Sequence, residues 1–361
     1  MLKKLLLTPQ LALLLLISSF HSFAEQEATK ELPCSSSKNT LAHEVKKATP
    51  IKKISPKYPV NAARKKLEGW VRLSFVIKAD GSVDLPVIED SSGIESFEEA
   101  ATEAVKQWKY NPAIRDEQNI EQCQNSVQLN FKMNKPTKGA SRKFVREFKS
   151  IHQLLDDKQL ADALVAINSL ENKPRQNFYE DKFFFSLKAK YYQYTGDNRQ
   201  ELRNLRKIIP QGKDYLPKGS YTYSLVRAFE LALLNNELSS ALYFYNQLKQ
   251  FNPEFENIDI LVSYVEKINT LISSSDNIYV GGQINERENW NHYLARSRFT
   301  VSKIEGELNS LDIRCDNHFS TYSLEVEKQW NIPESWGKCK VFVHGKQGAT
   351  FDLIEVANKA A

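Results

Sequence analysis

The chain has 361 residues, which is more than one ordinary hydrophobic core holds and suits two or three domains. Apolar residues make up 41% and charged residues 26%, the proportions of a soluble globular protein. The net charge of +5 is small for this length and argues against a dedicated nucleic-acid-binding protein, because such proteins concentrate basic residues on one face.

The first 24 residues have the pattern of a secretory signal peptide. The basic start MLKK precedes the apolar run LALLLLIS, and the small residues Ser22 and Ala24 stand where a signal peptidase reads. We therefore expect export and cleavage after Ala24, which leaves no transmembrane span. The alternative is that residues 1–24 stay as a membrane anchor, although a spanning helix needs about 20 apolar residues and this run is shorter.

Four cysteines follow the signal, and an even count in an exported chain predicts disulfides. Three pairings are possible. Sequence neighbourhood favours Cys34–Cys123 and Cys315–Cys339, because a long segment without cysteine separates the two couples. The alternative is that some of the four are free thiols.

A polar arm, residues 25–50, leads into a small α+β domain predicted over residues 51–134. The segment YPVNAARKKLEG predicts one or two helical turns after Pro59. GWVRLSFVI then alternates as a half-buried strand, with one row of side chains beginning at Trp70 and the other at Val71.

The rest of this domain continues the pattern. Asp80-Gly81 predicts a hairpin turn, and Pro86 in the second strand suggests an edge or a bulge. SFEEAATEAVKQW predicts an amphipathic helix with Ser96 as its N-cap. NSVQLNF predicts a third strand.

Residues 135–143 are a linker by composition, and residues 144–274 carry helical periodicity in three helix pairs. The clearest pair has the spacing of a tetratricopeptide repeat. Its repeat positions are Leu225, Ala228, Ala232, Ala241, Tyr245, Leu248 and Pro253. A looser copy has Glu201 where a small residue is usual, so the array is degenerate. The alternative is a generic helical bundle.

Residues 277–358 are predicted to form an all-β domain, a sandwich or a barrel. Short alternating runs are separated there by Gly, Asn and Asp, and Cys315 and Cys339 would join two of the strands. The predicted fold class is thus multidomain α+β: a small antiparallel α+β domain, an all-α helical array and a C-terminal all-β domain.

The segment PKYPVNAARKKLEGWVRLSFVIKADGSVDLPVIEDSSGIESFEEAATEAVKQWKYNPA resembles the C-terminal domain of the TonB energy-transducer family. The resemblance covers residues 51–133, about a quarter of the chain. The matching positions are Tyr58-Pro59, Ala63, Glu68-Gly69, Val71, Leu73, Phe75, Ile77, Asp80-Gly81, Val83, Ser92-Gly93, Phe97, Ala101, Ala104, Trp108 and Tyr110-Asn111-Pro112.

The resemblance implies a binding module whose last strand is a sheet edge, to which an outer-membrane receptor adds a short segment by main-chain hydrogen bonds. Carried onto this chain, the edge is residues 125–131, with Asn125, Val127, Leu129 and Phe131, or the alternate row, facing the partner. The implied location is the periplasm of a Gram-negative envelope. The implied partners are other envelope proteins, among them outer-membrane TonB-dependent receptors, and a homodimer is a further expectation. The alternative is that the chain's own arm or helical array covers this edge.

The chain also departs from the TonB pattern. Family transducers keep an uncleaved anchor and a long Pro-rich segment, whereas the arm here is short and poor in proline. Ser55 stands where transducers that bind receptors often have Gln. Because tetratricopeptide-like arrays also bind proteins, we expect a periplasmic adaptor. The alternative is a membrane-anchored transducer that couples a proton-driven motor to outer-membrane receptors.

Signatures of catalysis are missing from the sequence. It has no G-x-S-x-G, no H-E-x-x-H and no phosphate loop, so we expect no catalytic residues and no cofactor. Cys315, His318, Cys339 and His344 have a metal-like spacing, and a hydrolase or metal enzyme in the β domain is therefore a third hypothesis. A disulfide is favoured over a metal in an oxidising compartment.

Overall fold

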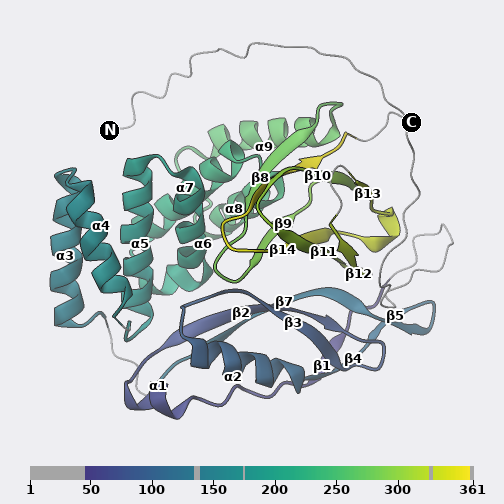
Figure 1. The fold of residues 1–361 in the computed structure, drawn as a ribbon, viewed down its shortest axis with the longest axis horizontal. Coiled ribbons are helices and arrows are strands. Elements are labelled where there is room, and N and C mark those ends of the chain that lie inside the picture. Colours follow the sequence, from purple (N-terminus) through teal and green to yellow (C-terminus); the bar gives the residue numbers. More distant parts are fainter. Residues whose placement is uncertain (1–44, 134–138, 174, 325–327, 358–361) are drawn as a thin grey trace.

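The computed structural model describes residues 45–133, 139–173, 175–324 and 328–357. It has three regions: a small α+β region at residues 49–131, a helical region at 142–273 and a β region at 278–355. Figure 1 shows the sheet of the first region lying between its own helix and the other two regions. The predicted fold class is confirmed.

The first region contains a three-stranded antiparallel sheet in the order β3-β2-β7 and two small two-stranded pairs, β1-β4 and β5-β6. Its elements are β1 (Thr49–Lys52), α1 (Val60–Arg64), β2 (Gly69–Ile77), β3 (Val83–Ser91), α2 (Glu95–Lys106), β4 (Lys109–Asn111), β5 (Ala113–Arg115), β6 (Gln118–Ile120) and β7 (Gln122–Phe131).

Helix α2 covers one face of this sheet because the odd-numbered side chains of β2 are all apolar. They form a core with Phe97, Val105 and Trp108, all of them buried. The predicted hairpin turn is confirmed: Gly81 has φ +79°, and a Cβ there would lie 1.9 Å from the carbonyl oxygen of Tyr110. The predicted N-cap of α2 was wrong, since Ile94 holds that position and Ser96 lies in the first turn.

Strand β3 forms one edge of the three-stranded sheet, and it is irregular near Pro86, as the proline predicted. The register with β2 shifts between Ser74 and Val76, and Leu85 has φ +49°. The bulge turns the Leu85 carbonyl toward the β region, where Arg314 Nη1 donates a hydrogen bond to it at 3.1 Å.

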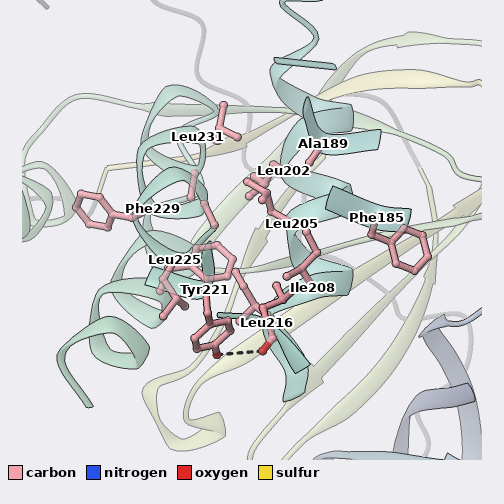
Figure 2. Packing of buried hydrophobic residues seen from close by; sticks show 14 of the residues in the cluster. Phe185, Ala189, Leu202, Leu205, Ile208, Leu216, Tyr221, Leu225, Phe229 and Leu231 are labelled. Carbon is pink, nitrogen blue, oxygen red and sulfur yellow. Dashed lines mark hydrogen bonds between the residues drawn. The ribbon is translucent and has the colours of Figure 1, made fainter. Parts of the chain in front are cut away.

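The helical region runs through α3 (Arg142–Asp156), α4 (Leu160–Glu171), α5 (Phe178–Thr195), α6 (Asn198–Tyr215), α7 (Lys218–Leu234), α8 (Leu238–Phe251) and α9 (Ile258–Ser273). The three predicted pairs are α3–α4, α5–α6 and α7–α8. Proline ends the regular part of α6, which breaks at Pro210 and Gln211. Figure 2 shows the apolar core that α5, α6 and α7 share, with the Tyr221 hydroxyl donating to the Ile209 carbonyl at 3.0 Å.

Four repeat positions of the clearest helix pair are tightly packed. Leu225, Ala228, Ala232 and Ala241 are 0% exposed. Glu201, at an equivalent position, is buried as well, and Arg227 neutralises it with Nε 2.7 Å from Oε1. A buried ion pair thus replaces small-residue packing in this repeat, and the likeness to tetratricopeptide repeats stays a prediction.

The β region is a sandwich of two four-stranded antiparallel sheets, ordered β13-β10-β15-β8 and β12-β11-β14-β9. Its strands are β8 (Ile278–Gln283), β9 (Asn289–Tyr293), β10 (Arg298–Glu305), β11 (Leu308–Cys315), β12 (Phe319–Ser323), β13 (Gln329–Asn331), β14 (Cys339–Gly345) and β15 (Thr350–Glu355). A short 3-10 helix, Glu334–Trp336, precedes β14.

A disulfide joins Cys315 and Cys339, which are register partners on the neighbouring strands β11 and β14. This confirms one of the two favoured pairings. Cys34 lies outside the described residues, as does the expected cleavage site after Ala24, so the pairing of Cys34 with Cys123 stays a prediction.

Candidate functional site

Strand β7 is the edge at which a partner strand is expected to add. It pairs with β2 from Gly69↔Phe131 to Ile77↔Gln122, and in the described parts of the chain no further strand lies beyond it in this sheet. An edge strand presents unpaired main-chain donors and acceptors, which is what strand addition requires.

The predicted row of side chains on β7 faces α2 instead of solvent. Phe131 is 2% exposed and stacks on Phe97 with ring centres 4.2 Å apart, while Val127 and Leu129 are half-buried against the same core. Asn125 donates from Nδ2 to the Gln122 carbonyl at 2.6 Å.

The alternate row therefore carries the accessible side chains of β7. Ser126 and Asn130 are exposed, and Gln128 between them is half-buried. Small polar side chains give an extended partner little to recognise, so the main chain of this segment is the feature available for binding. A partner-binding role for any of these residues stays a prediction.

Among the described residues, the first residues of β7 contact the β region and also the end of the arm, where the Ala48 N–H donates to Gln122 Oε1 at 2.9 Å. The Cys123 N–H donates to the Asp316 carbonyl at 3.3 Å, across the boundary between the two regions. Phe319, at the start of β12, packs with Val76, Cys123 and Leu85 in a small apolar cluster. With respect to the part of the chain that the structure describes, the accessible edge therefore runs from Ser126 to Asn130.

The face of the sheet opposite α2 is docked on the helical region. Trp70 is 0% exposed, and its Nε1–H donates to Asp181 Oδ2 of α5 at 2.9 Å. Arg175 Nη2 donates to the Ser92 carbonyl at 2.8 Å. The ammonium of Lys182, which is also buried, lies 4.9 Å from the centre of the Trp70 ring, and burial lowers the pKa of this lysine to about 8.

Two adjacent acidic residues of β3 join this face to both other regions. Glu89 Oε1 lies 2.7 Å from Lys340 Nζ of β14. Asp90 Oδ1 lies 3.2 Å from Lys207 Nζ of α6 and 4.0 Å from Arg287 Nη1, which precedes β9. The two carboxylates thus hold three cations from parts of the chain that are distant in sequence.

The charged groups in this interface shift one another's pKa values. Burial raises the pKa of Asp90, but Lys207 and Arg72 outweigh it and hold the pKa below its usual 3.8. Burial raises the pKa of Glu89 as well, and the Lys340 and Arg72 charges bring it below 4.5. Both groups are therefore ionised at neutral pH.

This interface was not predicted from the sequence. The alternation of β2 placed Trp70, Arg72, Ser74 and Val76 on one face without showing what that face meets. A signal existed, because Trp70 and Val76 are apolar residues on a face that a solvent-exposed sheet would make polar. The acidic pair in β3 is a second signal, since its carboxylates lie on the sheet and not in a loop.

The helical region has a groove of its own, with a volume of about 570 Å³. Helices α3, α5, α6 and α7 contribute its walls. The lining residues that offer rings, amides or charges are Phe148, His152, Phe183, Lys190, Gln193, Glu201 and Tyr223. Gln193 Nε2 donates to the Tyr223 hydroxyl at 2.7 Å, which links two of the helices across the groove.

A zinc site on the four residues with metal-like spacing is not compatible with this structure. The sulfurs of Cys315 and Cys339 are bonded to each other, and His344 Nε2 lies 3.3 Å from Asp312 Oδ2. Among the described residues, no group of three His, Cys, Asp or Glu side chains is placed to hold a metal ion.

The described helices include none with the length and apolar character needed to cross a membrane.

Comparison with known sequences finds a family match for one part of the chain. Residues 54–133 match the family described as Gram-negative bacterial TonB protein C-terminal. Protein tonB2 of Pseudomonas aeruginosa is 39% identical over 80 residues, which are 22% of this chain and 29% of that protein. Protein TonB of Vibrio cholerae is 36% identical over 63 residues, 18% of this chain and 26% of that protein. The chain thus spans less than a third of the length of the curated relatives it matches.

Solved structures of similar sequence are shorter. The solution structure of the Pseudomonas aeruginosa TonB C-terminal domain is 25% identical, covers 25% of this chain and 90% of its own, and has a TM-score of 0.22. A structure of the TonB2 protein from Vibrio anguillarum is 30% identical, covers 32% of this chain and 99% of its own, and has a TM-score of 0.21. Residues 54–133 are a TonB C-terminal domain, followed by a helical region and a β region that these comparisons leave unassigned.

Proposed function

We propose that this protein is a periplasmic adaptor in TonB-dependent outer-membrane transport or envelope assembly, and that its TonB C-terminal domain binds an extended segment of a partner along β7. The observation that carries the proposal is the edge position of β7, with the segment from Ser126 to Asn130 left uncovered by the described residues. Added strands gain affinity from main-chain hydrogen bonds, so a polar, partly exposed edge is sufficient.

The groove of the helical region supplies a second surface for the adaptor role. It combines aromatic walls with amide and hydroxyl groups, the composition that binds peptides in concave sites. With one surface on the TonB C-terminal domain and one on the helices, the protein would hold two partners, or two parts of one partner.

The proposal is tested by site-specific photocross-linking in cells. A photoreactive residue at Ser126 or Asn130 is expected to capture an envelope protein, because both positions are exposed on the edge strand. The same residue at Glu103, exposed on α2 on the other side of the domain, is the matched control and should capture little. Equal capture at all three positions, or capture of this chain alone, would contradict strand addition.

A membrane-anchored energy transducer is the second candidate, favoured by the similarity to TonB proteins. It requires residues 1–24 to remain on the mature protein. N-terminal sequencing separates the two functions: a mature chain that starts at Glu25 excludes the anchored transducer, and one that keeps Met1 excludes the cleaved adaptor.

A further inference from the structure

Three regions of the chain meet on the outer face of the TonB sheet, the face opposite α2. The helical region contributes Asp181, Arg175 and Lys207, and the β region contributes Arg287 and Lys340. All of these groups bind the TonB C-terminal domain through hydrogen bonds or ion pairs, and Arg287 also reaches Glu98 of α2 at 2.7 Å. We name these five side chains the clamp.

The β region also closes part of the partner-binding edge itself. The main-chain bond from Cys123 to Asp316 occupies the start of β7, and the Phe319 ring lies against the same end of the sheet. Lys340, which holds Glu89, lies on β14, the strand bonded to β11 by the disulfide. The contact at Cys123 and the ion pair at Glu89 therefore belong to one rigid sandwich.

We propose that the clamp is an autoinhibitory contact: closed, it limits an added strand to Ser126–Asn130, and open, it exposes the whole of β7. This inference rests on the proposed binding of a partner along β7. A partner that pairs over the full strand binds only the open form, so its affinity is reduced by the fraction of molecules that are closed.

The chemistry of the interface allows it to open. Its contacts are mostly charged and polar, and such interfaces between domains separate more readily than apolar cores. Burying the ions costs solvation free energy, and their pairing offsets most of that cost. The ion pairs therefore contribute little net free energy to docking. The TonB C-terminal domain has an apolar core of its own, whereas strand β8 of the β region packs into the core of the helical region. We therefore expect the domain to keep its fold when its contacts with the other two regions break.

Two variants open the clamp without touching β7. Lys340→Met leaves the Glu89 carboxylate without its nearest cation, and Lys207→Met does the same for Asp90. The matched controls are Lys338→Met and Lys213→Met, which remove exposed lysines from the same parts of the chain. All four variants lose one positive charge, so a general effect of net charge appears in the controls.

Hydrogen exchange of the full chain is the first measurement. In the Lys340→Met and Lys207→Met variants the amide of Cys123 is expected to exchange at least about tenfold faster, with Leu73 in the middle of β2 unchanged. The controls should match the unsubstituted chain. Unchanged exchange at Cys123 in both opening variants overturns the clamp, and equal acceleration at Leu73 means that the domain has unfolded instead of undocked, which overturns it too.

Photocross-linking from Gln124 and Ser126 is the second measurement. The unsubstituted chain should capture its partner from Ser126 alone, and the opening variants from both positions. Faster exchange at Cys123 with no gain of capture at Gln124 means that closure does not limit binding and overturns the autoinhibition. If neither position captures a partner in any variant, the proposed function fails together with the autoinhibition that rests on it, while the exchange result still decides whether the contacts form a separable clamp.

Discussion

The two faces of strand β2 are held by different chemistry. Val71, Leu73, Phe75 and Ile77 point at α2 and form an apolar core. On the opposite face, Trp70 donates to Asp181 of the helical region, and Arg72 pairs with Asp90 of β3, which also binds Lys207 of α6. The first face makes the domain fold, because apolar burial is the main favourable term in folding. The second face fixes where the folded domain sits. Changes on the two faces should therefore separate loss of folding from loss of docking.

The largest effect is expected on the α2 face. Phe97→Ala removes a ring that is 0% exposed and lies between Tyr58 and Phe131, and it should destabilise the TonB C-terminal domain by about 3–5 kcal/mol. Hydrogen exchange of β2 amides in the full chain measures this loss. Val60→Ala, at an exposed position of α1, is the control and should change little. A small effect of Phe97→Ala would show that docking alone maintains the fold.

Acid should release the outer face before the α2 face. The pKa values of Glu89 and Asp90 are below their ordinary 4.5 and 3.8, so their contribution to docking is fully present above about pH 4.5 and is lost as pH falls through the lower folded-state values. Exchange at Cys123 measured from pH 7 to pH 3, corrected for the intrinsic rate, should rise only below about pH 4. Asp90→Asn should weaken docking at neutral pH and reduce this acid response. A rise centred near pH 6 would point to histidine instead.

The sequence was sufficient to predict the features that depend on residues close together in the chain. Alternation, the Asp80-Gly81 turn and the Pro86 bulge located the three strands of the main sheet, and three helix pairs and two joined cysteines were placed correctly, whereas the short strands β1, β4, β5 and β6 were not predicted. The sequence was insufficient to predict contacts between residues that lie far apart in the chain. Alternation divides β2 and β7 into two rows each, but cannot show that Trp70 meets Asp181, 111 residues away, or that the row through Val127 faces α2.

A smaller effect is expected from the single hydrogen bond at the centre of the outer face. Trp70→Phe keeps a ring but removes the donor to Asp181, leaving that buried carboxylate with one partner fewer at a cost of about 1–3 kcal/mol. The loss should appear as faster exchange near Ser92 and Gln176, where the helical region touches the domain, and not in the middle of β2. Trp108→Phe is the matched control, because the Trp108 indole donates to Ile54 within the same domain. The comparison fails if both substitutions loosen the same amides.

The smallest effect is expected on β7 itself. Ser126→Ala changes an exposed side chain, so stability should stay within about 0.5 kcal/mol of the unsubstituted chain. If the partner adds as a strand, its affinity comes from the main chain, and capture from a photoreactive residue at Asn130 should be almost unchanged as well. A loss of capture of tenfold or more would mean that the partner recognises the hydroxyl, and binding would then depend on side chains. In that case specific polar side chains would decide binding at β7, as they decide docking on the outer face of β2. The strand would then not act as a general template for an added strand.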